Sequence, residues 1–327
     1  MPKPRITIVG LGLIGGSIGL ALKKANADLD IVGHDKDSRV AAAAQKRGAV
    51  NKTEWNLLNA CDGAALIVLA LPLGALRDTL RVLGKELSGG VIVTDTASTK
   101  TAVLEWAKVL PRDVQFVGGD PVIPHWHTSQ PEQKGIEAAD AELFDNAVYC
   151  LTPSPTASEN AVNTVAGLVG LLGAKPLFLD AQEHDGLITG AQHLATLLSI
   201  TLLQATTTSG GWRDLSKLAG SDYLHATALA ARDPATQRDL LLNHREDLER
   251  WIDASMETLQ ELRSAIARGD ATELDNLLKR MLAAREAWLT GKIITSPVEP
   301  LPATSFGDSA LRMFLGGLAQ RGEKQTK

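Results

Sequence analysis

Short hydrophobic runs alternate with longer helical stretches over the first 180 residues of the chain. The runs are rich in β-branched residues and read RITIVG, DIVGHD, AALIVLALP, GVIVTDT, QFVGG, AVYCLTP and KPLFLD. Continuous apolar strands separated by helices are typical of a parallel sheet that is covered by helices on both faces. The pattern therefore predicts a doubly wound parallel α/β domain over residues 1–180.

The strand pattern ends at about residue 181, and long segments rich in Ala, Leu, Arg and Glu follow. Their apolar residues recur at three- and four-residue steps, as in an amphipathic helix: Leu240, Leu241, Leu248, Trp251, Ile252, Met256, Leu259 and Leu262. Gly269-Asp270 predicts a helix stop followed by a new helix cap, and hence an antiparallel helix pair. We expect an all-helical second domain over residues 181–292 and a C-terminal tail over residues 293–327.

Composition excludes several classes of function. The 327 residues carry a formal net charge of -5, which provides no basic surface for nucleic acid. The chain has two cysteines, Cys61 and Cys150, too few for a disulfide framework or a CxxC metal site, so we expect a reducing, cytoplasmic location and no metal. We find neither a secretion signal nor an uninterrupted apolar span, and we expect no membrane partner.

A glycine-rich turn follows the first predicted strand. Gly10, Gly12 and Gly15 form a G-x-G-x-x-G pattern between ITIV and a helical stretch, the strand-turn-helix context of a dinucleotide-binding Rossmann domain. The first glycine permits the turn, the second lets a pyrophosphate approach the backbone, and the third allows close packing of helix and strand. We also assign the cofactor site Leu13, Ile14, Leu71 and Pro72.

Asp35 ends the second strand, 20 residues after Gly15. An acidic residue there hydrogen-bonds the 2′-hydroxyl of the adenosine ribose and repels a 2′-phosphate, so NAD is favoured over NADP. Lys36 and Arg39 weaken this preference slightly.

The stretch FVGGDP over residues 116–121 predicts a strand that stops abruptly into a loop, because Gly-Gly and Asp-Pro are both turn signals. Loops of this kind often present catalytic side chains. Asp120 is the candidate.

Three stretches resemble the prephenate and arogenate dehydrogenase (TyrA-type) family: TDTASTK over residues 94–100, FVGGDP, and EHDGLITGAQHLAT over residues 183–196. They resemble the family's D-x-x-S-x-K motif, its GGHP motif and its EHD segment, and the resemblance spans roughly residues 5–290. It implies oxidation of a carboxylated ring alcohol by hydride transfer to NAD(P), with loss of carbon dioxide, in tyrosine biosynthesis. It also implies a helical dimerisation domain and a homodimer.

By the same resemblance, Ser98 hydrogen-bonds near the substrate hydroxyl and Lys100 is the motif lysine. His193 matches the first histidine of the family's S-H-L-P-H pattern. Three other positions depart from the family: Asp120, Thr196 and Ala228 stand where the family has histidine, histidine and the arginine that binds the substrate carboxylate. Aspartate is a weaker base than imidazole near neutral pH, and a lost arginine removes a bidentate clamp.

Several side chains could compensate. His193 and His225 each lie three residues before a changed position, and Arg213 and Lys217 could supply positive charge, but a structural or solvated role is open for each. His125 and His127 could bind a metal, replace the missing histidine, or be ordinary loop residues. For His184-Asp185 we expect a role at the interdomain hinge.

The sequence thus leaves three functional hypotheses. The first is an NAD-dependent dehydrogenase of prephenate, arogenate or a related ring acid, with Ser98, Asp120 and His193 as catalytic residues. The second is a family member that binds NAD but has lost catalysis and serves as a sensor or partner subunit. The third, a different two-domain reductase, lacks the combination of GGxP and EHD segments.

Overall fold

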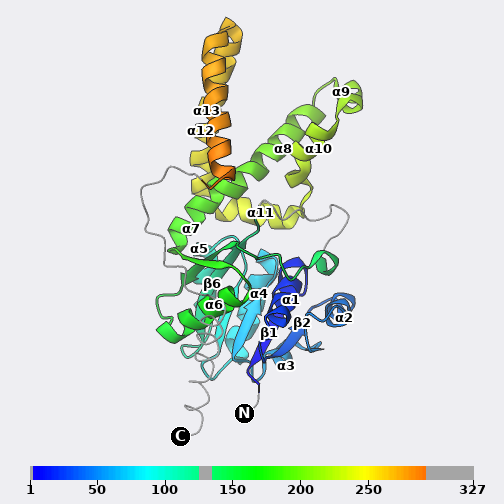
Figure 1. Cartoon of the computed structure of the whole chain (residues 1–327), viewed down its shortest axis with the longest axis vertical. Coiled ribbons are helices and arrows are strands. Elements are labelled where there is room, and N and C mark those ends of the chain that lie inside the picture. Colours follow the sequence, from blue (N-terminus) through cyan, green and yellow to red (C-terminus); the bar gives the residue numbers. More distant parts are fainter. Residues whose placement is uncertain (1–2, 125–134, 292–327) are drawn as a thin grey trace.

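The computed structural model describes residues 3–124 and 135–291, in which a sheet domain carries an extended set of helices (Figure 1). Eight strands form one sheet in the order β3-β2-β1-β4-β5-β6-β7-β8. Neighbouring strands are parallel except for β6 and β7, which are antiparallel. The doubly wound α/β prediction is confirmed, with one correction: the sheet is not parallel throughout.

The seven predicted strands are present, and an eighth was not foreseen. The strands are β1 (Arg5–Val9), β2 (Asp30–His34), β3 (Lys52–Thr53), β4 (Leu66–Leu69), β5 (Ile92–Asp95), β6 (Gln115–Val122), β7 (Val148–Pro153) and β8 (Lys175–Phe178). The unforeseen strand, β3, is a two-residue edge strand without an apolar run, so it gives no periodic signal.

Helices cover both faces of the sheet, and each face has its own core. These helices are α1 (Leu13–Lys24), α2 (Ser38–Lys46), α3 (Leu57–Cys61), α4 (Leu73–Glu86), α5 (Thr101–Ala107), η1 (Gly135–Ala138) and α6 (Glu159–Leu171). Helices α1, α2 and α6 pack on one face, and α4 and α5 on the other. Successive residues of a strand point to opposite faces, so in β4 Leu66 and Val68 belong to the first core while Ile67 and Leu69 belong to the second.

Strand β6 continues through the Gly-Gly and Asp-Pro turn signals, and Asp120 lies inside it, opposite Cys150 of β7. The expected loop at Asp120 is therefore wrong. The strand is extended by antiparallel pairing with β7, which begins 26 residues after β6 ends. Local turn signals contain no information about such a partner.

The second part of the chain is helical, as predicted. Its helices are α7 (Ala181–Ile188), a π-helical segment η2 (Thr189–His193), α8 (Leu194–Thr207), α9 (Trp212–Leu218), α10 (Ser221–Thr227), η3 (Ala228–Ala231), α11 (Pro234–Asn243), α12 (Arg245–Arg268) and α13 (Ala271–Leu289). Gly269 is left-handed, with φ 63°, and the Asp270 side chain caps α13, which confirms the predicted helix pair.

Helices α7 and α8 form one continuous helix, Ala181–Thr207, through η2. By length and composition alone it is apolar enough to cross a membrane. The buried side of its first half nevertheless carries His184, Asp185 and His193. Their polar groups contact the sheet domain.

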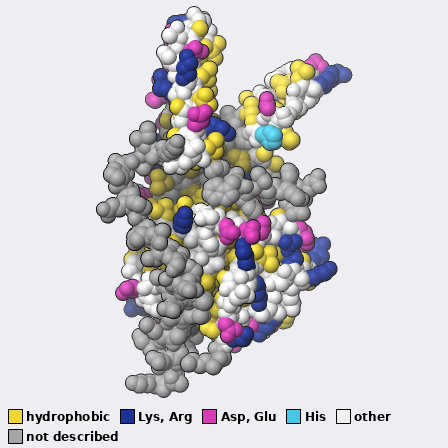
Figure 2. All heavy atoms as spheres, in the orientation of Figure 1, with side chains coloured by type: hydrophobic (Ala, Val, Ile, Leu, Met, Phe, Trp, Pro, Cys, Tyr) yellow, Lys and Arg dark blue, Asp and Glu magenta, His cyan; other side chains and the backbone are white. Residues whose placement is uncertain are grey.

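Helix α11 lies across the top of the sheet domain, and two arms project away from it (Figure 1). One arm is the α12–α13 hairpin, and the other carries α8, α9 and α10. Apolar side chains run along the exposed surface of both arms (Figure 2). They include Leu198, Leu224, Met256, Leu259, Ile266, Leu278, Met281 and Leu282, each more than two-fifths exposed.

Candidate functional site

The glycine turn between β1 and α1 has the geometry of a phosphate-binding loop. Gly10 has φ +91°, and a Cβ there would lie 2.2 Å from Ala70 O; a Cβ on Gly15 would lie 1.9 Å from Gly10 O. Both positions therefore require glycine. Gly12 is different, because a Cβ there would meet nothing within 4 Å. Open space thus lies in front of the α1 N-terminus, whose first amides have no side-chain cap.

Asp35 is held against this turn. Its Oδ2 accepts a hydrogen bond from Leu11 N at 2.8 Å, and its Oδ1 accepts one from Asp37 N at 2.9 Å. Arg39 pairs with Asp37, with Nη2–Oδ2 at 2.8 Å, and its side chain is otherwise exposed to solvent.

The other residues assigned to the cofactor lie around the same turn. Leu13 and Ile14 begin α1, and Leu71 and Pro72 follow β4, with Leu71 Cδ2 3.0 Å from the position of a Gly10 Cβ. The turn, the acidic residue at the end of β2 and the open space together fit a dinucleotide.

A buried acid-imidazole-acid chain joins the sheet domain to the helical domain. His184 Nε2 lies 3.1 Å from Asp120 Oδ2, and its Nδ1 lies 2.9 Å from Asp185 Oδ1. All three side chains are almost fully buried. Ionised carboxylates only accept hydrogen bonds, so the imidazole carries both protons and donates to each.

Asp185 also binds the start of α5. Its Oδ1 and Oδ2 accept hydrogen bonds from Lys100 N at 2.7 Å and Thr101 N at 2.9 Å. The chain from Asp120 to α5 therefore fixes α7 against β6 and the β5–α5 turn. This arrangement supports the interdomain role expected for His184-Asp185.

The neighbours of His184 dominate its ionisation. Burial alone lowers the pKa of His184, but hydrogen bonds to Asp120 and Asp185 outweigh burial and raise the pKa to about 11. Burial likewise raises the pKa of Asp185, yet hydrogen bonds from His184 and from the amides of Lys100 and Thr101 bring it down to about 2. His184 is therefore an imidazolium at neutral pH.

Ser98 lies just after β5, and its backbone contacts His193. The His193 Nε2 lies 3.4 Å from Ser98 O, and the His193 ring packs against His244 with centroids 4.4 Å apart. Burial, together with the neighbouring His244, lowers the pKa of His193 to about 4. His193 is therefore neutral near pH 7, in contrast to His184.

Lys100 is fully buried. Its Nζ lies 2.6 Å from Asp95 Oδ2 and 2.6 Å from Gly119 O. The lysine of the D-x-x-S-x-K stretch therefore ties the end of β5 to β6 and is shielded from solvent. Breaking such a buried pair costs about 3–5 kcal/mol.

Of the three changed positions, Thr196 is buried on α8, where its hydroxyl donates to Gln192 O at 3.2 Å, and Ala228 begins η3.

The side chains that could compensate for these changes do not lie together. His225 is exposed on α10, and Arg213 and Lys217 lie on α9 at the outer end of an arm (Figure 1), with Lys217 paired to Asp214. His125 and His127 lie outside the described residues. Within the described ranges, no group of three or more potential ligands could hold a metal ion.

A cavity of about 760 Å³ adjoins the buried chain between β6–β8 and α7–α8. Most of its lining is apolar, and its cationic side chains are His184 and Arg232. Arg232 also lines a cavity of about 70 Å³ with His193 and Thr196. Sequence reasoning missed Arg232, although its position inside the ARDP stretch, four residues after Ala228, was a usable signal.

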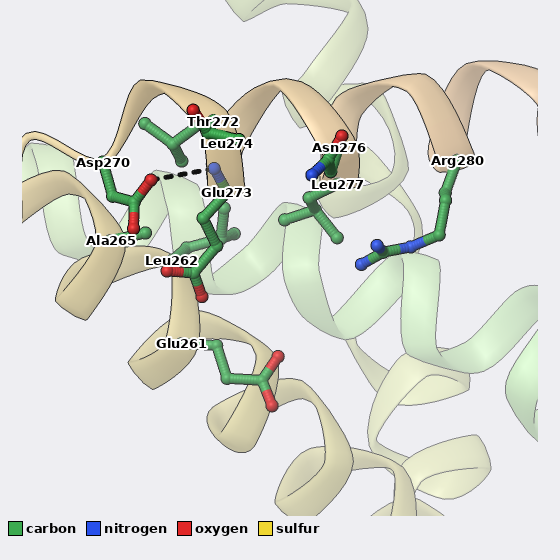
Figure 3. A pocket seen from close by; sticks show the side chains of 10 residues that line it. All are labelled: Glu261, Leu262, Ala265, Asp270, Thr272, Glu273, Leu274, Asn276, Leu277 and Arg280. Carbon is green, nitrogen blue, oxygen red and sulfur yellow. Dashed lines mark hydrogen bonds between the residues drawn. The ribbon is translucent and has the colours of Figure 1, made fainter.

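Another cavity, of about 470 Å³, lies between α12 and α13 near the tip of their hairpin (Figure 3). Glu261, Asp270 and Glu273 are its acidic lining residues, and Asp270 accepts a hydrogen bond from Glu273 N at 2.9 Å as the cap of α13. This cavity lies well away from the strand ends that carry Ser98 and Asp120 (Figure 1).

Comparison with known proteins agrees with the geometry. Residues 18–177 match the family model "Prephenate dehydrogenase, nucleotide-binding domain", and residues 180–280 match "Prephenate dehydrogenase, dimerization domain". The chain is 31% identical over 283 residues to the prephenate dehydrogenase of Bacillus subtilis (strain 168), covering 85% of this chain and 74% of the relative. It is 32% identical over 260 residues to that of Lactococcus lactis subsp. cremoris (strain MG1363), covering 75% and 69%.

Among solved structures, Synechocystis arogenate dehydrogenase is 26% identical with a TM-score of 0.70, and the match covers 87% of this chain and 99% of that one. The two family models match the sheet domain and the helical domain in that order, and the two bacterial relatives match 85% and 75% of the chain. The chain belongs to the prephenate/arogenate dehydrogenase family of oxidoreductases.

Proposed function

We propose that the protein is an NAD-dependent dehydrogenase that oxidises and decarboxylates prephenate, arogenate or a closely related carboxylated ring alcohol in tyrosine biosynthesis. One observation carries this proposal. Strands β1, β4, β5 and β6 are adjacent and parallel, so the glycine turn, Leu71, Ser98 and Asp120 meet at one edge of the sheet. Ligands of doubly wound sheets bind at this carboxyl edge.

The cofactor proposal rests on the turn and on Asp35. Gly10, Gly12 and Gly15 with the α1 amides at Leu13 and Ile14 would hold the pyrophosphate, and Leu71 and Pro72 would flank the dinucleotide. The Asp35 carboxylate would bind the ribose hydroxyls and repel a 2′-phosphate. The Arg39 guanidinium, which could favour a 2′-phosphate, is paired with Asp37 in a solvent-exposed ion pair. When bound, NAD accepts the hydride from the ring carbinol.

The chain's own residues handle the substrate hydroxyl and its proton. Ser98 would donate a hydrogen bond to the hydroxyl oxygen and orient it. Asp120 Oδ2 is occupied by His184, whereas Oδ1 has no hydrogen-bond partner among the described residues. That oxygen would accept the hydroxyl proton as the carbon–hydrogen bond breaks. The bond to the ring carboxylate then breaks, carbon dioxide leaves, and the released electron pair completes the aromatic ring; Asp120 returns the proton to the phenolate.

His184 and His193 have different tasks in this scheme. The His184 imidazolium fixes the Asp120 carboxylate and offsets part of the negative charge of the buried chain. His193 would stay neutral, bind Ser98 O and keep the β5–α5 turn in place beside the substrate. This division assigns proton transfer to Asp120 and positioning to the two histidines.

The exposed apolar arms support a homodimer. The matched dimerisation domain covers residues 180–280, and the exposed apolar side chains of α8 to α13 would be covered by a second copy of the chain. A cytoplasmic location is consistent with Cys61 and Cys150, both buried and unpaired.

Replacing Ser98 by Ala tests the mechanism. Loss of one donor aimed at the reacting oxygen should lower turnover by roughly 100-fold while leaving NAD affinity unchanged. Steady-state kinetics and NAD titration by fluorescence measure the two quantities separately. An equal loss in both would show that Ser98 supports the cofactor site instead of the reaction.

A further inference from the structure

The cavity beside His184 has an uneven distribution of charge. Apolar side chains from β6, β7, β8, α7 and α8 form most of its wall, and neither Asp nor Glu is among its described lining residues. His184 and Arg232 supply its positive groups, and the charge of His184 is matched by Asp120 and Asp185. Arg232 is the cation that remains unmatched within the described lining.

Arg232 has no hydrogen-bond or ion-pair partner in the part of the chain that the structure describes. The neighbouring carboxylate, Asp233, is engaged elsewhere, because its Oδ2 accepts a hydrogen bond from Thr236 N at 2.8 Å as the cap of α11. Other basic side chains near this region are paired: Arg238 with Asp239, and Arg250 with Asp247. A free guanidinium at the rim of an apolar cavity has its donors available for a ligand.

The backbone that carries Arg232 is firmly held. Ala230 N donates to Ser199 Oγ of α8 at 3.2 Å. From α11, Gln237 Nε2 donates to Leu229 O at 3.2 Å and to Ala230 O at 3.4 Å. The segment just before Arg232 is thus bonded to both flanking helices, which limits the positions that its side chain can reach.

The electrostatics also place Arg232 close to the site. Its positive charge contributes to lowering the pKa of His193, after burial and the neighbouring His244. Arg232 lines the small cavity together with His193, whose ring contacts the turn that carries Ser98. Arg232 therefore lines both the large cavity beside His184 and the small cavity beside His193.

We infer that Arg232 binds a carboxylate of the ring substrate. A planar guanidinium forms two parallel hydrogen bonds to a carboxylate, and the apolar wall would receive the ring. This inference rests on the proposed function for the substrate class. It moves the carboxylate-binding arginine from the position of Ala228 to a residue four positions later, just beyond η3.

Binding of two probes in the presence of NAD tests the inference without requiring turnover. Hydroxyphenyl propionate carries the ring and the carboxylate, and the corresponding hydroxyphenyl propanol has the same ring without charge. Calorimetry on the full-length protein should show that Arg232→Ala lowers the affinity for the propionate by roughly 10- to 100-fold, the usual contribution of hydrogen bonds to charged groups. The affinity for the propanol should not change. Arg232→Lys should recover part of the loss, because lysine keeps the charge but not the planar fork.

Arg112→Ala provides the control, since Arg112 is exposed just before the amino end of β6, at the opposite edge of the sheet. It should leave both affinities unchanged, and thermal unfolding of each variant verifies the fold. Equal weakening of both probes by Arg232→Ala, no weakening at all, or failure of the unaltered protein to bind the propionate would overturn the inference. Propionate binding that depends on Arg232 but no NADH from any ring substrate would uphold the inference and reject the proposed activity.

Discussion

At the scale of single residues, the two buried histidines of the continuous α7–α8 helix have opposite ionisation. His184 faces carboxylates through both nitrogens, while His193 faces a backbone carbonyl and another imidazole. The first environment stabilises the imidazolium, and the second does not. Without these structural contacts, both histidines would be assigned the unperturbed pKa of 6.5.

Nitrogen NMR shifts of the histidines test this contrast. His184, with a pKa raised to about 11, should remain doubly protonated at neutral pH, and His193, with a pKa lowered to about 4, should be neutral. Variants His184→Gln and His193→Gln assign the two signals. A His184 ring that titrates near its unperturbed value of 6.5 would contradict the buried acid-imidazole-acid chain.

The same pKa shifts determine how the free energy of unfolding depends on pH. Because its pKa is raised, His184 makes its full contribution to the free energy of unfolding below pH 6.5, and this contribution is lost as the pH rises toward about 11. The lowered pKa of His193 acts in acid: its stability contribution is present above 6.5 and is lost as pH falls toward about 4. Each single group changes the unfolding free energy by at most about 1.4 kcal/mol per pH unit. Urea unfolding at several pH values measures both slopes, and each should disappear in the matching Gln variant.

Some site residues were accessible to sequence reasoning, and others were not. Asp35 and the three glycines follow a fixed spacing, so the sequence indicates them directly. The contact between Asp120 and His184 joins residues 64 positions apart, and no local pattern encodes it. Arg232 was overlooked because the family position falls on Ala228, and whether a shifted arginine reaches the cavity depends on how η3 packs on α8 and α11.

At the scale of elements, the positions of strands and helices were predictable because the spacing of apolar residues reflects which side chains are buried. The sequence pattern did not predict which strands pair with each other. The antiparallel β6–β7 pair keeps Asp120 within a strand, and the π-helical segment η2 interrupts an otherwise regular apolar helix. Gly190 lies in η2, and a Cβ there would lie 2.5 Å from the Trp251 ring, so close packing of α12 depends on it.

The glycine turn offers a test at this scale. Gly12→Ala should leave thermal stability unchanged, because its Cβ meets no protein atom within 4 Å, and should reduce NAD affinity by roughly tenfold or more, about 1.4 kcal/mol. Gly15→Ala should instead destabilise the fold, since its Cβ would lie 1.9 Å from Gly10 O. Melting curves and NAD titrations of both variants separate the two effects. A Gly12→Ala variant that binds NAD normally would exclude the pyrophosphate from this space.

At the scale of the whole molecule, the exposed apolar arms are the feature that a single chain leaves unexplained. Large apolar patches on a folded chain mark interaction surfaces, and the matched dimerisation domain, residues 180–280, covers one arm and most of the other. The helical patterns predicted these helices but not the direction in which they project.

Light scattering should give twice the 34.7 kDa mass of one chain. Replacing Leu259 and Leu282, each about three-fifths exposed, by Glu should shift the mass toward one chain, because burying unpaired carboxylates in an interface is costly. Lys279→Glu, at a charged and exposed position of α13, is the matched control. A single-chain mass for the unaltered protein would contradict the dimer.

The central claim is that an enzyme with Asp120 in place of histidine still oxidises a carboxylated ring alcohol. The most direct measurement is NADH formation by the purified protein with NAD, offered prephenate and arogenate in separate assays. We expect turnover of one of them, abolished in Asp120→Asn, since the amide accepts no proton. NAD binding without turnover of either substrate would contradict the claim and favour a member of the family that binds the cofactor as a sensor or partner subunit.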